Sequence, residues 1–201
     1  DGSAVGKNQD GSGNIYVRVA GAIQDRAVDS LSLVDLFNYT RGNSWANNLN
    51  WNTTPMDTWN GVTITAGRVT NVALSSNSLN GSLPSSLGDM NALATLDLSL
   101  NLLNGNVPQT MSNMSSLSDL NISDNQLNSL PDLSAMGSLS ILNVANNYFD
   151  FSDLEPNTGQ SYSVSYNPQI EYGSDQLRGV FDGQTLTIST DPGGTSNAYQ
   201  W

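Results

Sequence analysis

Apolar residues recur between Val69 and Phe149 in one fixed order, L-x-x-L-x-L-x-x-N-x-L, in which Val, Ile or Phe replaces some of the leucines. The apolar fourth and sixth positions alternate with polar ones, which predicts a short strand with one buried face. A single copy cannot bury its own apolar face, so successive copies must stack and pair their strands into a parallel sheet. The four copies start at Val69, Leu93, Leu117 and Leu139, and their later apolar positions are Val72, Leu74, Leu79; Leu96, Leu98, Leu103; Leu120, Ile122, Leu127; and Leu142, Val144, Phe149.

One asparagine stands near the end of the pattern in every copy, where the strand must turn away. The intervals between these asparagines are 101−77=24, 125−101=24 and 147−125=22 residues, so they repeat with the stack. A side-chain amide both donates and accepts hydrogen bonds, and it can therefore satisfy backbone groups that the turn leaves unpaired. We expect a structural ladder of stacked asparagines, formed by Asn77, Asn101, Asn125 and Asn147.

The residues between the core positions are expected to point out of the sheet on its concave face. Their side chains are small, polar and mildly acidic, and Ser99 is expected to be exposed among them. A glycosidase of the paired-carboxylate type needs two acids at a set separation, one of them in an apolar pocket. An open sheet offers no such pocket, so the pattern favours a solvated face or a binding surface over catalysis. The candidate ligand-binding residues are Asn71, Thr95, Asp97, Asp119, Asn121, Asp124 and Asn143.

A helix and a tryptophan-rich stretch precede the first copy. Asp29 is predicted to be the N-cap of the helix, because apolar residues at helical spacing follow it. Trp45, Trp51 and Trp59 come next, with asparagines between them. A solenoid must cover its open end, and large aromatic rings would do so. A sugar-binding platform is the alternative, but the position of the cluster directly before the first copy favours a cap.

The repeats resemble those of plant-type leucine-rich repeat proteins. The segments 79–84 and 103–108 read L-N-G-x-[LV]-P as in that type, whereas the third copy departs from it at 127–131. The plant-type cap has a helix followed by an element similar to C-x-W-x-G-V-x-C, of which this chain keeps Trp59, Gly61 and Val62 without the cysteines. A cysteine-free cap with mixed repeats is similar to secreted, multidomain bacterial proteins, particularly those of the Bacteroidota. The resemblance covers residues 27–158 and implies the fold and an extracellular location, but no particular ligand.

The N-terminal segment is expected to contain a turn and a strand. The alternation of Ile15, Val17 and Val19 predicts a strand, although it has no obvious partner nearby. The Asp-Gly and Ser-Gly steps before it favour a tight hairpin turn. A calcium loop with Asp10 and Asn14 as ligands is the alternative, although the bidentate Glu of an EF-hand is missing.

The C-terminal segment changes character. An alternating strand over 184–190, a turn and the final Trp201 resemble the opening strands of an immunoglobulin-like (Ig-like) domain. These strands are only part of a sandwich. Either the missing strands follow in a longer protein, or the N-terminal strand pairs with them, in the same chain or in a neighbouring copy.

The sequence thus predicts an α/β solenoid: a short leucine-rich repeat with a parallel β-sheet, a helical N-terminal cap and a C-terminal all-β, Ig-like segment. The expected parts are an N-terminal turn and strand segment at 1–26, the cap at 27–68, the repeats at 69–158, a C-terminal cap or linker at 159–175 and the start of the Ig-like sandwich at 176–201.

Composition narrows the function. Lys+Arg is 6 and Asp+Glu is 18, and the resulting net charge of −12 disfavours nucleic acid and anionic membrane surfaces as partners. Only 12% of the residues are charged, so Asn, Ser, Thr and Gly must cover most of the surface, as suits an extracellular protein. The absence of Cys and His excludes thiol chemistry, Ser-His-Asp triads and imidazole metal sites on this chain. No apolar run reaches the length of about 18 residues that a membrane span needs.

We therefore expect a secreted or cell-surface module that binds a protein or glycan on the concave face and performs no chemistry. It needs no cofactor, unless calcium binds at Asp10 and Asn14. Two alternatives stay open: a structural protomer or rigid spacer of an extracellular fibre or surface layer, and an accessory binding module of a larger secreted enzyme.

Overall fold

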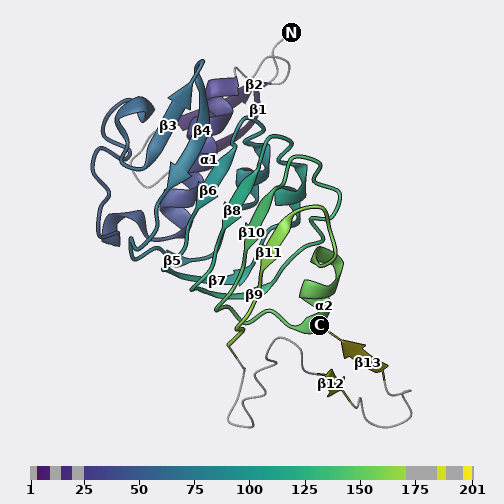
Figure 1. Ribbon diagram of the computed structural model, residues 1–201. Coiled ribbons are helices and arrows are strands. Elements are labelled where there is room, and N and C mark those ends of the chain that lie inside the picture. Colours follow the sequence, from purple (N-terminus) through teal and green to yellow (C-terminus); the bar gives the residue numbers. More distant parts are fainter. Residues whose placement is uncertain (1–3, 10–14, 20–24, 171–184, 189–196, 201) are drawn as a thin grey trace. The chain divides into compact units, whose positions relative to one another are not determined.

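The computed structural model of the protein describes residues 4–9, 15–19, 25–170, 185–188 and 197–200. It divides into two units, Asp1–Ile170 and Glu171–Trp201. In the first unit, short strands lie side by side in successive turns of a solenoid (Figure 1). The four central strands of the main sheet each arise from one copy of the apolar pattern, so the sequence-based prediction of a parallel-sheet solenoid is confirmed.

The main sheet has six strands in the order β11-β10-β8-β6-β4-β3. Its five strands from β4 to β11 are parallel, whereas β3 pairs antiparallel with β4 through a tight turn at Ala66 and Gly67. Both turn residues have positive φ, as a two-residue hairpin requires. The sequence pattern predicted the four central strands, but not β3 or β11. The strands are β3 Val62–Thr65, β4 Arg68–Ala73, β6 Thr95–Asp97, β8 Asp119–Asn121, β10 Ile141–Asn143 and β11 Ser163–Ser165.

A second, three-stranded parallel sheet follows the ladder asparagines, in the order β5-β7-β9. Its first two strands form along the L-N-G segments, and each proline after those segments precedes a 3-10 helix. Gly81 has φ +135 and stands so close to the Tyr39 carbonyl that a Cβ would lie 2.1 Å from its oxygen. The glycine therefore lets β5 approach the cap. The elements are β5 Asn80–Gly81, β7 Leu102–Asn106, β9 Gln126–Ser129, η3 Ser85–Asp89 and η4 Gln109–Asn113.

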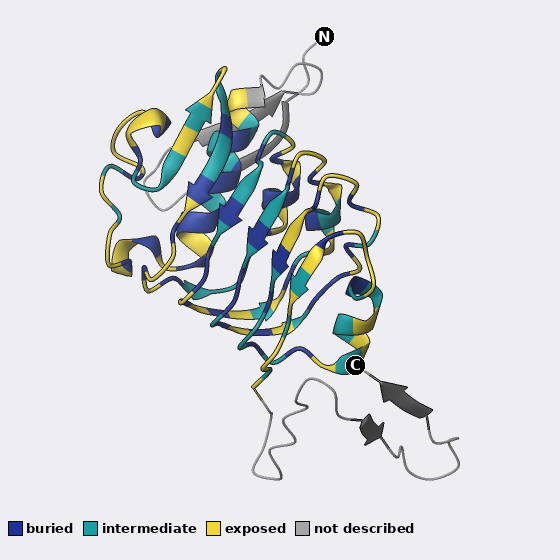
Figure 2. Ribbon diagram, viewed as in Figure 1, coloured by how far each residue is buried: buried dark blue, intermediate teal, exposed yellow. Residues whose placement is uncertain are grey.

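The core runs between the two sheets and the 3-10 helices. All the apolar positions of the four copies are buried, and most of them have no exposed surface. Methionines such as Met90 and Met114 fill the space beside the leucines, and both are fully buried. Figure 2 shows buried residues alternating with partly exposed ones along the central strands, which is the pattern expected of strands with one buried face.

The ladder asparagines are buried and bond to the backbone of two consecutive copies. Asn101 Nδ2 donates to the carbonyl oxygens of Leu74, Leu98 and Ser99 at 2.9, 2.9 and 3.0 Å. Its Oδ1 accepts from the backbone N–H groups of Asn77 and Leu79, both at 3.0 Å. The asparagines of the next two copies repeat the pattern, with three carbonyl acceptors and one N–H donor each. The ladder therefore binds each copy to the one before it.

Residues outside the four copies complete the ladder at both ends. The Asn77 side chain accepts from the Asn47 N–H at 2.6 Å and donates to the Asn47 carbonyl at 3.0 Å, so a cap residue acts as the preceding rung. At the other end, Gln169 Oε1 accepts from the Phe149 N–H at 3.2 Å, and its Nε2 donates to the carbonyl oxygens of Val144, at 3.0 Å, and Tyr166. Gln169 follows the last asparagine by 169−147=22 residues, and β11 belongs to this degenerate fifth copy.

The N-terminal cap consists of α1 Asp25–Tyr39, η1 Gly42–Ser44 and η2 Met56–Thr58. The three tryptophans pack against one another and against Phe37: Trp51 stacks on Trp59 with ring centroids 4.9 Å apart, and Trp45 meets Trp51 edge to face at 4.8 Å. Each indole N–H donates to a backbone carbonyl. The rings are 3–6% exposed, so they fill the cap as expected and do not present an open stacking platform to a sugar.

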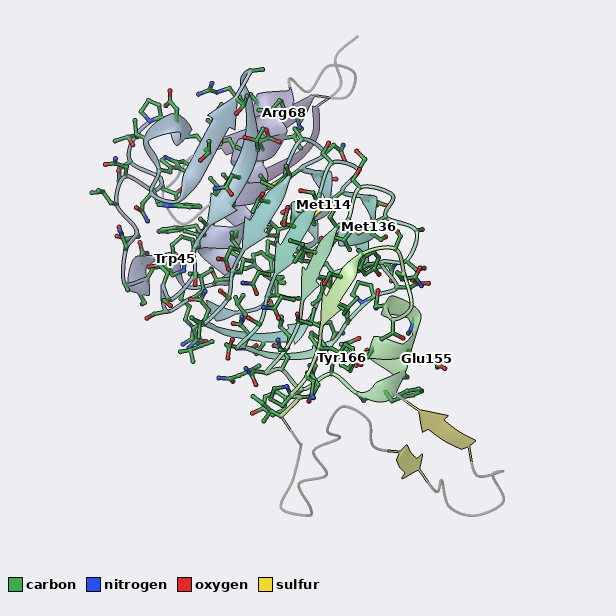
Figure 3. The ribbon with its side chains drawn as sticks, viewed as in Figure 1. Trp45, Arg68, Met114, Met136, Glu155 and Tyr166 are labelled. Carbon is green, nitrogen blue, oxygen red and sulfur yellow. The ribbon has the colours of Figure 1, made fainter. Side chains whose placement is uncertain are left out.

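Asp29 is not the N-cap of the helix, and that prediction was wrong. The helix starts at Asp25, and Asp29 lies one turn inside it with no exposed surface. Its carboxylate accepts from Arg68 Nε at 2.9 Å and Nη2 at 3.0 Å, and from the backbone N–H of Val69 at 2.8 Å. Asp29 therefore joins the cap helix to the start of β4. Figure 3 labels Arg68 near one end of α1 and Trp45 near the other.

The far end of the solenoid carries α2 Phe151–Leu154 and η5 Glu155–Asn157. A capping box between Asp150 and Asp153 starts α2, and the Ser152 hydroxyl that donates to Asp150 lowers the pKa of that carboxyl. Asn157 is buried and accepts from the Leu133 N–H at 2.9 Å, which secures the last turn to the repeats.

The two flanking β segments each form an antiparallel pair. The strand predicted at Ile15–Val19 is β2, and its partner is β1 Ala4–Gln9, which was not recognised in the sequence. Likewise β12 Thr185–Ile188 pairs with β13 Asn197–Gln200. Within the described residues the N-terminal strand β2 thus has a partner, β1. The Ig-like sandwich and strand pairing between copies remain predictions.

The ladder predicts a large loss of stability for Asn101→Ala. The N–H groups of Asn77 and Leu79 and the Leu74 carbonyl lose their partner in a buried position, whereas the carbonyls of Leu98 and Ser99 each keep another donor. We expect the free energy of unfolding to fall by about 3 kcal/mol or more. The measurement is urea unfolding followed by circular dichroism. Asn128→Ala is the control, because Asn128 is exposed and its side chain makes no hydrogen bond within the described residues; we expect a change below about 0.5 kcal/mol. Equal losses in the two variants would contradict the ladder.

The cap predicts a different outcome for Trp59→Ala. Removing a buried indole that stacks on Trp51 leaves a cavity, and we expect a loss of about 3–5 kcal/mol in the same assay. Leu49→Ala is the matched control in the cap, since Leu49 is 63% exposed. A Trp59 variant as stable as the Leu49 variant would show that the ring does not hold the cap together.

Candidate functional site

The outward side chains of the main sheet form rows that run across the parallel strands. We call this surface the polar face, made of the outward residues of β4, β6, β8, β10 and β11 and of the turns after the first four. The register aligns one row of Asn71, Thr95, Asp119, Ile141 and Ser163, and a second of Ala73, Asp97, Asn121, Asn143 and Ser165. The predicted ligand-binding residues are thus brought together on one surface, which β11 extends by two serines.

Hydrogen bonds to the following turn hold the second row in place. Asp97 Oδ1 accepts from both the N–H and the hydroxyl of Ser99, at 3.0 and 2.7 Å. Asn121 Oδ1 accepts from Ser123 in the same way, at 3.3 and 2.9 Å. These local bonds orient each carboxylate or amide.

The serines after the strands are less accessible than expected. Ser99 is 5% exposed and Ser123 4%, so the prediction that Ser99 is exposed was wrong. The reason is that the second-row side chain bonds back to the serine two residues later and accepts a hydrogen bond from its hydroxyl. Ser75 Oγ also lies 3.0 Å from Ser99 Oγ, which links the first two copies. Ser99 and Ser123 thus support the polar face and contribute little of its accessible surface, whereas Ser75 is exposed.

A row of left-handed residues borders the polar face at the turn. Ser76, Leu100, Asp124 and Asn146 have φ of 55, 56, 56 and 54°. Asn and Asp adopt this conformation readily because their short side chains bond locally, whereas leucine does not. Asn146 Nδ2 donates to Asp124 Oδ1 at 2.7 Å, while Leu100 is 56% exposed.

Several side chains of the first row have no structural partner. Asn71 and Thr95 are partly exposed and make no side-chain hydrogen bond within the described residues. Asp119 Oδ2 accepts from Ser118 Oγ at 2.6 Å, and its Oδ1 accepts no hydrogen bond within the described residues. Ile141 is 50% exposed beside it, a feature of the surface that sequence reasoning did not select.

The acids of the polar face are partly exposed, and their hydrogen bonds come from neighbouring serines and Asn146. Among the described residues, no group of three or more Asp, Glu, His or Cys is arranged to hold a metal ion. The candidate calcium ligands Asp10 and Asn14 lie outside the described residues. None of the described helices is long and apolar enough to cross a membrane.

Comparisons with known proteins agree with this geometry. Residues 67–127 match the family model described as leucine rich repeat, whereas none of the curated proteins compared matches the chain. The crystal structure of PEPR1-AtPEP1 is similar with a TM-score of 0.52 and 20% identity, over 70% of this chain and 24% of that one. The ectodomain of the receptor kinase SOBIR1 from Arabidopsis thaliana has a TM-score of 0.46 and 19% sequence identity, and the match covers 70% of this chain and 92% of that one. A chain of the BIR3–SERK2 complex from the same plant has a TM-score of 0.43 and 26% sequence identity, and the match covers 71% of this chain and 95% of that one.

The family match and the PEPR1 structure identify the fold as a leucine-rich repeat solenoid. The SOBIR1 ectodomain is also among its structural neighbours. The predicted fold of the repeats is therefore confirmed. The bacterial source, secretion and the Ig-like segment stay predictions. The chain spans 24% of the length of the PEPR1 chain that it resembles.

The hydrogen bonds of the second row predict different outcomes for two changes at one position. Asp97→Asn keeps the Oδ1 acceptor, as Asn121 does in the next copy, and should change the free energy of unfolding by less than about 0.5 kcal/mol. Asp97→Ala removes the acceptor from the Ser99 N–H and hydroxyl and should cost about 1–2 kcal/mol. Urea unfolding measures both, and equal values would show that this carboxylate does not order the turn.

Proposed function

We propose that this chain is an extracellular, non-catalytic binding module whose polar face recognises a protein or glycan ligand. The proposal rests on the different roles of two sets of polar side chains, the buried asparagines of the ladder and the outward residues of the polar face. The buried asparagines satisfy the backbone, and no buried side-chain nitrogen or oxygen of the described residues lacks a partner. On the polar face only the second row shares this task, through the bonds of Asp97, Asn121 and Asn143 to backbone N–H groups. First-row side chains such as Asn71 and Thr95 make no such bond within the described residues.

Binding is consistent with the chemistry of this surface. Amide, hydroxyl and carboxylate groups stand in register on five strands, so that donors and acceptors are held at fixed separations. Adjacent parallel strands lie about 4.8 Å apart, which gives the surface a regular spacing across the sheet. Rigid strands hold side chains more accurately than loops do, and such an arrangement suits recognition of an extended ligand.

The edge of the main sheet favours a second candidate function. In the described part of the chain, β11 is the last strand of this sheet. An edge strand can recruit a strand from another molecule. Copies joined in this way would make the solenoid a protomer or spacer of an extracellular fibre. Sedimentation velocity separates the two functions, because a binding module stays monomeric over the concentrations at which a fibre protomer assembles.

The proposal predicts that an obstruction on the polar face abolishes ligand binding. Thr95→Trp places a large ring in the first row between Asn71 and Asp119, and Thr95 can be changed safely because its hydroxyl has no partner in the described residues. We expect at least about a tenfold loss of affinity, since the ring would hold a ligand off the sheet. Binding is measured by surface plasmon resonance against ligands first found with a glycan array and a panel of purified extracellular proteins.

The matched control is Asn128→Trp, which adds the same ring at an exposed position of β9 in the second sheet. This variant should bind like the unmodified chain. If Thr95→Trp also binds like the unmodified chain, the ligand does not use the polar face. If only Asn128→Trp loses binding, the second sheet is the recognition surface and the proposal fails.

A further inference from the structure

Charge is distributed very unevenly along this chain. Residues 1–68 contain six acidic and five basic residues, and residues 171–201 contain four and one. Between Val69 and Ile170 there are eight acidic residues and no Lys or Arg. The solenoid therefore has no basic side chain of its own to neutralise it. Its acidic residues are Asp89, Asp97, Asp119, Asp124, Asp132, Asp150, Asp153 and Glu155.

Three of these acids meet on the polar face. The register pairs Thr95 with Asp119 and Asp97 with Asn121, so Asp97 and Asp119 are diagonal neighbours on adjacent strands. Such neighbours lie about 7–8 Å apart. Asp124 follows on the same copy as Asp119, at the turn after β8. The described ion pairs, Asp29–Arg68 and Arg26–Asp57, belong to the cap, so the three face carboxylates have no cationic partner in the described chain.

Two exposed aliphatic side chains stand beside these carboxylates. Ile141 is 50% exposed and pairs in register with Asp119. Leu100 is 56% exposed and precedes Asp124 in the row of left-handed turn residues. A left-handed conformation disfavours leucine, and the equivalent positions of the other copies carry Ser, Asp and Asn. Nothing in the folding of the turn requires Leu100, which makes it a feature of the surface.

We propose that the occupant of the polar face is a protein segment that carries Lys or Arg side chains together with an apolar one. The basic groups pair with Asp97, Asp119 and Asp124, and the apolar group covers Leu100 or Ile141. The inference rests on the proposed binding function and specifies its partner. Charge complementarity selects this occupant, because an acidic surface with no cation of its own repels acidic proteins and sulfated or uronic glycans.

The test variant removes the three charges and keeps the hydrogen bonds. In Asp97→Asn/Asp119→Asn/Asp124→Asn, each amide oxygen can accept the bonds that the carboxylate accepts now. The fold already tolerates asparagine at two of these places, since Asn121 is equivalent to Asp97 in its row and Asn146 to Asp124.

The charge-matched control is Asp57→Asn/Asp132→Asn/Glu155→Gln. All three residues are exposed and lie outside the strands of the main sheet. Figure 3 labels Glu155 beside α2, away from those strands. The control changes the net charge by the same amount as the test variant, and the one described ion pair that it breaks, between Arg26 and Asp57 at 3.9 Å, is exposed and contributes little. A difference in binding between the two variants therefore reports on the position of the charges.

The experiment pans a phage-displayed library of random peptides of about twelve residues, a length that can cross all five strands, against the full chain. We expect selected peptides enriched in Lys and Arg. The selected peptides should bind the test variant about tenfold more weakly than the unmodified chain, whereas the control variant should bind them as the unmodified chain does. Raising NaCl from about 0.15 to 0.5 M should weaken their binding to the unmodified chain several-fold. Leu100→Asn should also weaken binding while the melting temperature stays equal or rises, because asparagine suits the left-handed turn.

The outcomes separate this inference from the proposed function. Peptides without basic enrichment, or a test variant that binds as the control does, overturn the inference. If, in either of these cases, the selected peptides fail to bind Thr95→Trp, the binding function of the polar face stands. Peptides that bind Thr95→Trp normally overturn both. A library that yields no binder overturns the basic segment as occupant, and the glycan array then decides the proposed function.

Discussion

The structure depends on one constraint, which is that a chain turning inside its own core must not leave backbone groups unpaired. Asn101 meets it with five hydrogen bonds, two of them from N–H groups of the preceding copy and one to a carbonyl of that copy. The same side chain thus closes a turn and fixes the distance to its neighbour. Because a buried polar group without a partner costs about 1–3 kcal/mol, this position has little freedom. The strand register and the rows of the polar face follow from the ladder.

The constraint also explains how the solenoid ends. A repeat has neighbours on both sides, so the first and last copies need substitutes from elsewhere in the chain. The backbone of Asn47 supplies the missing partner at the start, and Gln169 supplies it at the end. Gln169 is longer than asparagine, but it offers the same donor and acceptor. The cap adds a second attachment through Asp29, which bonds both to Arg68 and to the first residue of the first copy.

The sequence carried most of the information on the repeats because each copy repeats the same local requirement. Apolar periodicity located the central strands and core, and the asparagine spacing located the ladder. The sequence pattern did not reveal contacts between residues that lie far apart along the chain. An aspartate near a helix start suggests an N-cap, but Asp29 lies one turn inside and its partner Arg68 is 39 residues away. β11 was missed because polar Gln169 replaces the asparagine and the fifth copy lacks leucines, although its 22-residue offset was visible.

For the surface, the pattern predicted which residues point outward but not how accessible each would be. Ser99 occupies an outward position, yet Asp97 folds over it, because a hydroxyl and a carboxylate two residues apart in a turn bond to each other. Leu100 shows the reverse case. Its left-handed backbone is imposed by the ladder turn, which Ser76, Asp124 and Asn146 adopt as well. The fold therefore sets the conformation of this position and leaves its side chain free to vary. A leucine there costs stability relative to asparagine and exposes apolar area. Since neither the core nor the turn gains stability from Leu100, its contribution is expected in the contact with a binding partner.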